Sequence, residues 1–125
     1  MPNCETKTWR VLIVEDEMLL AMNLEDMLQE LGHEVVAVAT RIPQALTFAS
    51  SSDIDLAILD LNLSGALSFP VADVLRNRAV PFLFATGYGF QGLTENYRSE
   101  YVLAKPYVIR ELEKAIASVM TDVDD

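Results

Sequence analysis

The stretch VLIVED, residues 11–16, decides the fold class, because four consecutive apolar residues run directly into two carboxylates. A continuous apolar run of this length, rich in β-branched residues, is typical of a strand buried on both faces, as in a parallel sheet. Similar runs occur at residues 35–39, 56–59, 82–85 and 102–104. Helical patterns alternate with these runs. The sequence therefore predicts an α/β fold with a single doubly wound, five-stranded parallel sheet and helices on both faces.

The predicted helices are recognised by their apolar stripes and their end signals. The stripe of the first helix consists of Leu20, Leu24, Met27, Leu28 and Leu31. Gly32 is a suitable stop for this helix, and Pro70 is a suitable first-turn residue for a later one. A short helix is expected over residues 43–49, and a last helix is expected from Ile109 onward. Between Gly89 and Arg98 the helical signal is weak, so we expect a short or distorted fourth helix there.

Composition narrows the range of partners. The chain has 125 residues, which suits one domain, placed here at 9–121 with flexible termini at 1–8 and 122–125. A formal net charge of −10 argues against binding to DNA or to an anionic membrane surface. The single cysteine, Cys4, excludes an internal disulfide and a cysteine-rich metal site. No apolar run has the length of a signal peptide or a membrane span, so a cytoplasmic protein is expected.

Polar residues come directly after four of the predicted strands. They are Glu15, Asp16, Asp60, Thr86 and Lys105. In an open parallel sheet the carboxyl ends of the strands share one edge, where ligands bind. A single Asp after a strand is more often a helix N-cap than a catalytic group. The joint pattern of an acidic pair, a lone Asp, a Thr and a Lys is what predicts a common site.

The three carboxylates of this group point to a metal. Carboxylates at neighbouring strand ends repel one another unless a cation lies between them. Oxygen-only ligands with open positions fit Mg²⁺ better than Zn²⁺. The only histidine, His33, comes directly after the turn glycine and is expected to be solvated.

With these residues in place, the sequence from Trp9 to Met120 resembles the receiver domains of two-component response regulators. The resemblance implies the flavodoxin-like (βα)5 fold, with strand order 2-1-3-4-5. It implies that Asp60 is the phosphoacceptor, that Thr86 hydrogen-bonds a phosphoryl oxygen, and that Lys105 pairs with the carboxylate or the phosphoryl group.

The same resemblance implies a Mg²⁺ site and a peptide geometry. Mg²⁺ would be held by Glu15, Asp16, Asp60 and the backbone carbonyl of Asn62. The peptide bond between Lys105 and Pro106 is usually cis in this family, a geometry that is accessible before proline.

Two further strings resemble an atypical receiver subgroup known mainly from alphaproteobacteria. They are Phe-Ala-Thr-Gly-Tyr-Gly, residues 84–89, and Lys-Pro-Tyr, residues 105–107. In that subgroup the fourth helix is reduced and the usual coupling of the Thr to an aromatic switch residue is not used. Here the switch position holds Val102, and the preceding Tyr101 is expected to point to the opposite face of the sheet.

The expected function is that of a stand-alone receiver. A sensor histidine kinase or a histidine phosphotransfer protein would donate the phosphoryl group in a Mg²⁺-dependent reaction. The chain would catalyse its own phosphorylation and dephosphorylation without being a turnover enzyme. Fewer than about twenty residues come after Pro106, too few for an effector domain. Output would then pass to an unknown downstream protein, or the domain would act as a phosphate shuttle or sink.

Three other functions are weighed against this one. A haloacid-dehalogenase-type phosphatase needs a second Asp two residues after its nucleophile, where this chain has Asn62. A flavodoxin-like cofactor binder needs Ser, Thr or Gly after the first strand, and Glu15-Asp16-Glu17 would repel a flavin phosphate. A pseudo-receiver, a phosphorylation-independent interaction module, is the remaining alternative.

The first helix is the expected docking surface for the phosphoryl donor. Met18 and Met22 lie one turn apart and almost opposite the buried stripe, with Leu19 on a flank. Exposed methionines at this spacing form an adaptable apolar surface that suits helix-on-helix docking.

Overall fold

One five-stranded parallel sheet forms the centre of the molecule. The computed structural model describes residues 8–51, 53–87, 97 and 100–124. The strands of the sheet are β1 (Arg10–Val14), β2 (Glu34–Ala39), β3 (Leu56–Asp60), β6 (Phe82–Thr86) and β7 (Val102–Ala104). Their order is β2-β1-β3-β6-β7, and every neighbouring pair is parallel. The predicted fold class and strand order are therefore confirmed.

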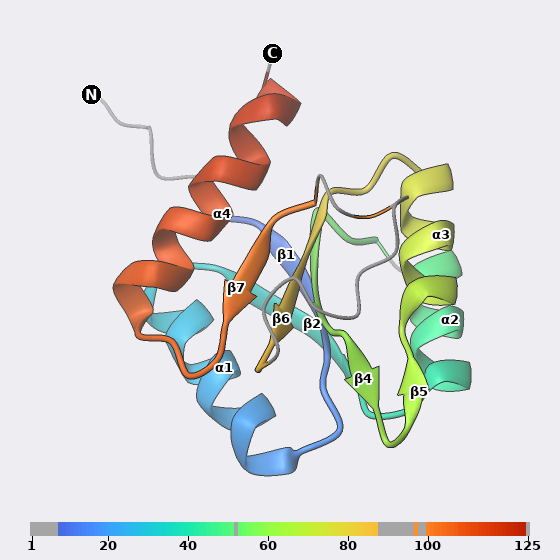
Figure 1. Cartoon of the computed structure of the whole chain (residues 1–125). Coiled ribbons are helices and arrows are strands. Elements are labelled where there is room, and N and C mark those ends of the chain that lie inside the picture. The colour runs from blue at the N-terminus through green and yellow to red at the C-terminus, as the bar shows by residue number, and fades with distance from the viewer. Residues whose placement is uncertain (1–7, 52, 88–96, 98–99, 125) are drawn as a thin grey trace.

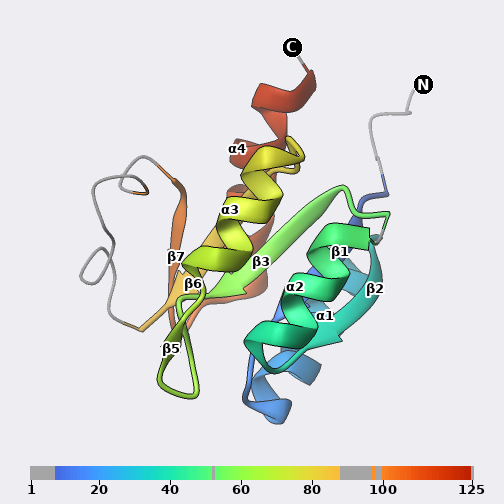
Figure 2. The same ribbon diagram turned by 90° about the vertical axis from the view of Figure 1, so that its right-hand side faces the viewer.

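Helices cover both faces of the sheet, as Figures 1 and 2 show. The helices α1 (Met18–Glu30) and α4 (Ile109–Asp124) lie on one face, and α2 (Ile42–Ser51) and α3 (Phe69–Asn77) lie on the other. Strand side chains alternate between two separate cores because successive residues point to opposite faces. In β1, Val11 and Ile13 pack toward α1 and α4, and Leu12 and Val14 pack toward α2 and α3.

A small hairpin comes directly after β3. The strands β4 (Asn62–Leu63) and β5 (Ala66–Leu67) pair antiparallel around Ser64 and Gly65, whose φ angles are 52° and 91°. Positive φ at both central residues is the geometry of a tight hairpin turn, and it favours glycine. Strands of two residues are too short to leave an alternating pattern in the sequence, so the hairpin could not be predicted from periodicity.

Two details differ from the sequence expectations. Leu20 is 41% exposed and does not join the buried stripe of α1, which consists of Ala21, Leu24 and Leu28. The reason is that α1 starts beyond the end of β1, so its first turn projects past the sheet (Figure 1). His33 is half-buried, and its Nδ1 accepts a hydrogen bond of 3.1 Å from the Trp9 N–H. This histidine is therefore part of the fold, and burial lowers its pKa.

Other expectations lie beyond the described residues. The reduced fourth helix, predicted between Gly89 and Arg98, falls outside them, apart from Tyr97. Helix α4 continues past residue 121, where the domain end was placed, and the domain bounds stay a prediction. Within the part of the chain that the structure describes, no helix combines the length and the apolar character needed to cross a membrane.

Phe84→Ala tests the core on the α2 and α3 side. Phe84 is fully buried at the centre of an aromatic cluster with Phe69, Phe82 and Tyr97. Removing its ring should lower the free energy of unfolding by about 3–5 kcal/mol, as is usual for a buried Phe. Denaturant unfolding measures this change. Leu19→Ala, at a side chain 81% exposed, is the control and should change stability by less than about 0.5 kcal/mol. Equal losses in both variants would contradict the assignment of the core.

Candidate functional site

The strand ends of the sheet bring the predicted polar residues to one edge. Glu15 and Asp16 come after β1, Asp60 ends β3, Thr86 ends β6 and Lys105 comes after β7. The backbone N–H of Lys105 donates to the Thr86 carbonyl oxygen at 2.9 Å, which fastens two of these ends together. The side chains of Glu15, Asp16, Asp60 and Lys105 meet as predicted, and Thr86 lies buried beside them in the adjacent strand.

Strand alternation explains why three of these side chains meet. Ile13, Ile58 and Leu103 all pack toward α1 and α4. Glu15, Asp60 and Lys105 each come two residues after one of these apolar residues. Because side chains alternate along a strand, they point to the same face. Thr86 continues the other parity, because Phe84 packs toward α2 and α3. The site thus lies across the sheet edge, with its ion cluster toward one helical layer and its threonine toward the other.

An ammonium group holds two carboxylates in this cluster. Lys105 Nζ donates to Glu15 Oε1 at 2.7 Å and lies 3.3 Å from Asp60 Oδ2. All three side chains are largely buried, and that of Asp60 is only 13% exposed. One positive charge faces two carboxylates here, and Asp16 adds a third nearby. The cluster therefore has an excess of negative charge that a cation would neutralise.

Burial and charge set the protonation of these groups. Burial raises the pKa of Asp60 to about 6; the charge of Lys105 opposes this shift, and the charge of Glu15 adds to it. Burial would lower the pKa of Lys105, but the hydrogen bond to Glu15 and the charges of both carboxylates raise it. Lys105 is therefore a permanent cation, and the Asp60 carboxylate is held in an environment that disfavours its charge.

Asp16 is held by the hairpin that the sequence did not reveal. Its Oδ2 accepts hydrogen bonds from the Ser64 N–H at 3.0 Å and from the Ser64 hydroxyl at 2.9 Å. Burial would raise the pKa of Asp16, but the hydrogen bonds from Ser64 outweigh it and lower the pKa. Ser64 and Gly65 are residue types that favour turns, but the contact of Ser64 with Asp16 joins residues 48 positions apart along the chain.

The carboxylates form a candidate metal centre. One oxygen from each of Glu15, Asp16 and Asp60 lies within 4.8 Å of the other two. An all-oxygen donor set of this kind suits Mg²⁺. The side chain of Asn62 is directed elsewhere, since its Oδ1 accepts a hydrogen bond from the Gly65 N–H at 2.9 Å. The expected role of its backbone carbonyl stays a prediction.

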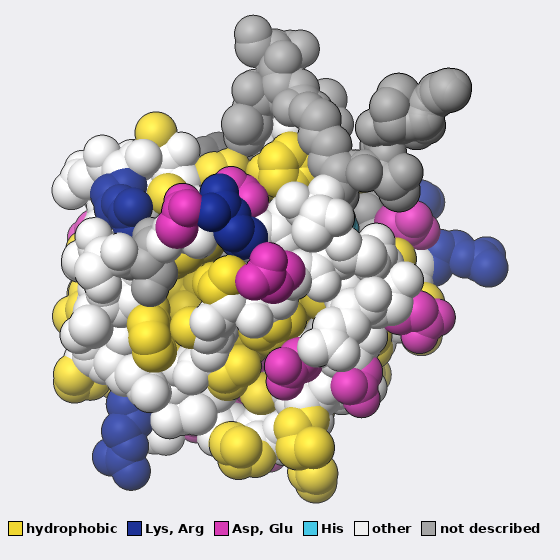
Figure 3. Space-filling model, turned by 180° about the vertical axis from the view of Figure 1, so that it is seen from behind, with side chains coloured by type: hydrophobic (Ala, Val, Ile, Leu, Met, Phe, Trp, Pro, Cys, Tyr) yellow, Lys and Arg dark blue, Asp and Glu magenta, His cyan; other side chains and the backbone are white. Residues whose placement is uncertain are grey.

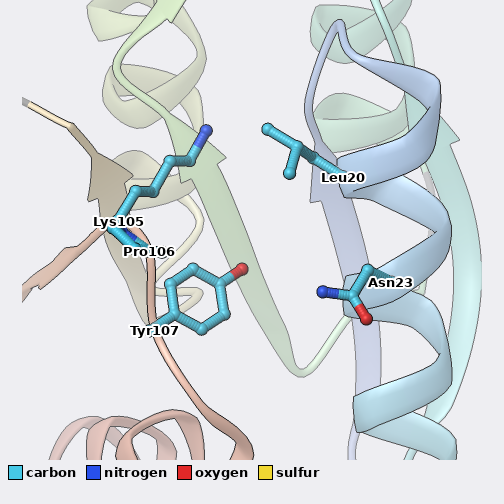
Figure 4. A pocket seen from close by; sticks show the side chains of 5 residues that line it. All are labelled: Leu20, Asn23, Lys105, Pro106 and Tyr107. Carbon is cyan, nitrogen blue, oxygen red and sulfur yellow. The ribbon is translucent and has the colours of Figure 1, made fainter.

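A pocket of about 320 Å³ lies beside the ion cluster, between α1 and the connection from β7 to α4. In Figure 4, Lys105 and Tyr107 face Leu20 and Asn23 across it. Burial raises the pKa of Tyr107 to about 12, and the charges of Glu15 and Asp60 add to the shift. The peptide bond between Lys105 and Pro106 is cis, as expected.

The residues at and next to the switch position lie on opposite faces of the sheet. Val102 packs toward α2 and α3, and Tyr101 packs toward α1 and α4, which confirms the expected alternation. Tyr97, which no sequence pattern singled out, is only 3% exposed and joins the core with Phe84. No strand or helix pattern surrounds Tyr97 in the sequence, so nothing there indicated that it is buried.

Asp60→Asn should stabilise the metal-free protein at neutral pH. Because the folded-state pKa of Asp60 lies above the usual 3.8, the unfolded chain loses this proton first as the pH rises. Wild-type stability should therefore fall between about pH 4 and pH 6 relative to the variant, and stay lower above pH 6. After allowance for partial solvation, Asp60→Asn should raise the free energy of unfolding at pH 7 by about 1–2 kcal/mol.

Denaturant unfolding at several pH values in the presence of EDTA measures this gain. Asp73→Asn, at an exposed carboxylate of α3, is the control and should show the pH dependence of the wild type. A gain from Asp60→Asn that is as large at pH 4 as at pH 7 would contradict the raised pKa.

Comparisons with known proteins agree with this geometry. The family model of the response regulator receiver domain matches residues 11–117. The phyllosphere-induced regulator PhyR of Methylorubrum extorquens is 34% identical over 114 residues, which cover 88% of this chain and 43% of that protein. The chain spans about half the length of the curated relatives it matches.

Two solved structures of SdrG show the same fold, each at 40% identity. SdrG from Sphingomonas melonis Fr1 is 40% identical, with a TM-score of 0.82 and coverage of 93% of this chain and 98% of that one. The BeF3-activated conformation of SdrG from Pseudomonas melonis Fr1 aligns with a TM-score of 0.78 over 89% of this chain and 95% of that one. With a five-stranded receiver fold, clustered carboxylates and a family match over most of its length, the chain belongs to the response regulator receiver domain family.

Proposed function

We propose that the chain receives a phosphoryl group on Asp60 from a sensor histidine kinase or a histidine phosphotransfer protein. The observation that carries this proposal is the position of the Asp60 carboxylate. It lies 3.3 Å from Lys105 Nζ, in a cluster with Glu15 and Asp16 at the carboxyl edge of the sheet. In this proposal the chain reacts once with each phosphoryl group and is not a turnover enzyme.

The side chains divide the chemistry between them. An Asp60 oxygen attacks phosphorus and forms the new P–O bond, while the bond from phosphorus to the donor nitrogen breaks and its electron pair leaves with the imidazole. Such a transfer depends mainly on positioning and on stabilising the charge spread over the phosphoryl oxygens. Lys105 supplies a fixed cation, which Glu15 orients through the 2.7 Å hydrogen bond. Thr86, at the end of the adjacent strand, donates its hydroxyl to a phosphoryl oxygen.

Mg²⁺ fits the acidic cluster by the chemistry of its donors. Glu15, Asp16 and Asp60 would hold it, together with the backbone carbonyl of Asn62. When bound, the ion neutralises the excess charge of the carboxylates and favours the ionised form of Asp60. Ser64 contributes by fixing one oxygen of Asp16 through two hydrogen bonds. That leaves the other Asp16 oxygen for the ion.

The donor docks on the exposed apolar face of α1, formed by Met18, Leu19 and Met22. Their side chains are 61%, 81% and 54% exposed. Figure 3 shows hydrophobic side chains projecting at the lower rim of the molecule, the edge at which α1 begins. Leu20 and Asn23 of the same helix line the pocket together with Lys105, so a donor helix packed on α1 would bring its phosphohistidine near Asp60.

Output passes from the domain by contact with another protein. The near-complete coverage of SdrG supports a stand-alone receiver, and the acidic charge argues against direct DNA binding. Action as a phosphate shuttle or sink uses the same Asp60 chemistry. A cytoplasmic location stays a prediction from the sequence.

Incubation with acetyl phosphate and Mg²⁺ tests the proposal. The wild-type protein should gain one phosphoryl group, and peptide mass spectrometry should place it on Asp60. Asp60→Asn should abolish the gain while the fold survives, because the side chains are nearly equal in size. EDTA should prevent labelling of the wild type. A folded wild-type protein that gains no phosphoryl group from any donor would favour the interaction module that works without phosphorylation.

Charge substitutions on α1 test the docking face. Met18→Glu and Met22→Glu should slow phosphotransfer from a protein donor by about tenfold or more, because each places a charge within an apolar contact. Labelling by acetyl phosphate should keep its wild-type rate. Gln29→Glu adds the same charge at the far, exposed end of the same helix and is the matched control. Equal slowing with both donors would mean that the methionines serve the active site or the fold.

A further inference from the structure

The Tyr97 side chain lies inside the core between the sheet and α3. Its ring stacks on that of Phe69, with centroids 4.8 Å apart and an interplanar angle of 9°. It meets Phe84 edge-on at 5.9 Å and 86°. Stacked and edge-on rings are the favoured arrangements of aromatic pairs. Tyr97 is thus a fixed part of an aromatic cluster centred on β6.

The Tyr97 hydroxyl is buried without a hydrogen-bond partner among the described residues. The Ser68 hydroxyl, next to Phe69, is buried and unsatisfied in the same way. Buried tyrosine hydroxyls usually find a partner, and each exception in a folded protein calls for an explanation. A phenylalanine would fill the same space without this cost, so the hydroxyl points to a second state in which it is bonded.

Arg76 of α3 packs over the Tyr97 ring. The guanidinium carbon of Arg76 lies 4.3 Å from the centroid of the Tyr97 ring, and Arg76 Nη2 lies 2.6 Å from Glu100 Oε2. Glu100 stands two residues before β7. Tyr97 therefore connects α3 with the chain that enters the edge strand of the sheet.

The cluster also connects to the phosphorylation site. Phe84 and Thr86 are two residues apart in β6 and point to the same face. Thr86 is buried at 2% exposure, at the end of the strand beside Asp60. Val102 lies on this face too but carries no ring or hydroxyl, and Tyr101 lies on the opposite face. Phe84, Tyr97 and the inner residues of α3 pack in one core, and Thr86 continues the same face of β6 at its end.

We propose that Tyr97 is the residue that transmits phosphorylation of Asp60 to the surface formed by α3 and the entry to β7. This inference rests on the proposed function, because it needs Thr86 to move toward a phosphoryl oxygen. The space that Thr86 leaves lets the Tyr97 ring slide past Phe84, and the hydroxyl gains a hydrogen bond. The Arg76–Glu100 pair then rearranges, and the surface on that side of the molecule changes.

Fluorine NMR on the protein labelled with 3-fluorotyrosine tests this role. The four tyrosines give separate signals, and Tyr97→Phe assigns that of Tyr97. Beryllofluoride with Mg²⁺ serves as the phosphoryl mimic, and its own fluorine signal reports whether it is bound. Binding should shift the Tyr97 signal, and Thr86→Ala, saturated with the mimic, should lose that shift. Tyr101, on the opposite face, is the internal control and should respond alike in both proteins.

Tyr97→Phe supplies a second measurement that a purely structural role would not change. It should leave the resting protein as stable as the wild type or more stable, because it removes an unsatisfied hydroxyl. The affinity for beryllofluoride should fall about three- to tenfold, the effect of losing one neutral hydrogen bond in the phosphorylated state.

The outcomes separate this role from the proposed function. Bound mimic without a shift of Tyr97, a shift that survives Thr86→Ala, or unchanged affinity in Tyr97→Phe each overturns the role of Tyr97 alone. If no beryllofluoride binds to the wild type, both the proposed function and the role of Tyr97 fall.

Discussion

The hydrogen bond between Lys105 and Glu15 joins residues 90 positions apart, and the site depends on it. The same ammonium lies 3.3 Å from Asp60, so three strand ends are tied by one cation. The sheet places β3 between β1 and β6, with β7 beyond, and so brings these ends to one edge. The cation does not balance the carboxylates around it. The edge is therefore held together but left short of positive charge, a state suited to binding Mg²⁺ and then a phosphoryl group.

The two apolar cores supply the stability that lets the sheet edge keep this excess of negative charge. Strands β1, β3 and β6 are buried along almost their whole length, with α1 and α4 packed on one face and α2 and α3 on the other. Burial of apolar surface supplies the main stabilisation of such a fold. The raised pKa of Asp60 costs stability at neutral pH; the charge of Lys105 reduces that cost, and burial of the apolar layers offsets the rest. Perturbed pKa values of this kind cluster at functional sites.

Features that depend on strand alternation and strand ends are predicted well from the sequence. The apolar runs before Glu15, Asp60 and Lys105 fix both the sheet edge and the face on which these side chains meet. Features that depend on contacts between distant short segments are predicted poorly. Ser64 reaches Asp16 through a hairpin with two-residue strands, and Leu20 is exposed because α1 projects past the sheet. Tyr97 is buried against rings that come from two other segments, α3 and β6, and no local sequence pattern records these contacts.

The alternation of side chains also explains how one chemical event can engage both faces of the sheet. Lys105 points to the layer of α1 and α4, beside the pocket with Tyr107 and Leu20. Thr86 points to the layer of α2 and α3, where Phe84 lies. In the proposed reaction a phosphoryl group on Asp60 contacts Lys105 and Thr86 at once. Phosphorylation therefore changes contacts in both helical layers. A donor can therefore occupy the α1 side while the response develops on the α3 side, and neither process has to share its surface with the other.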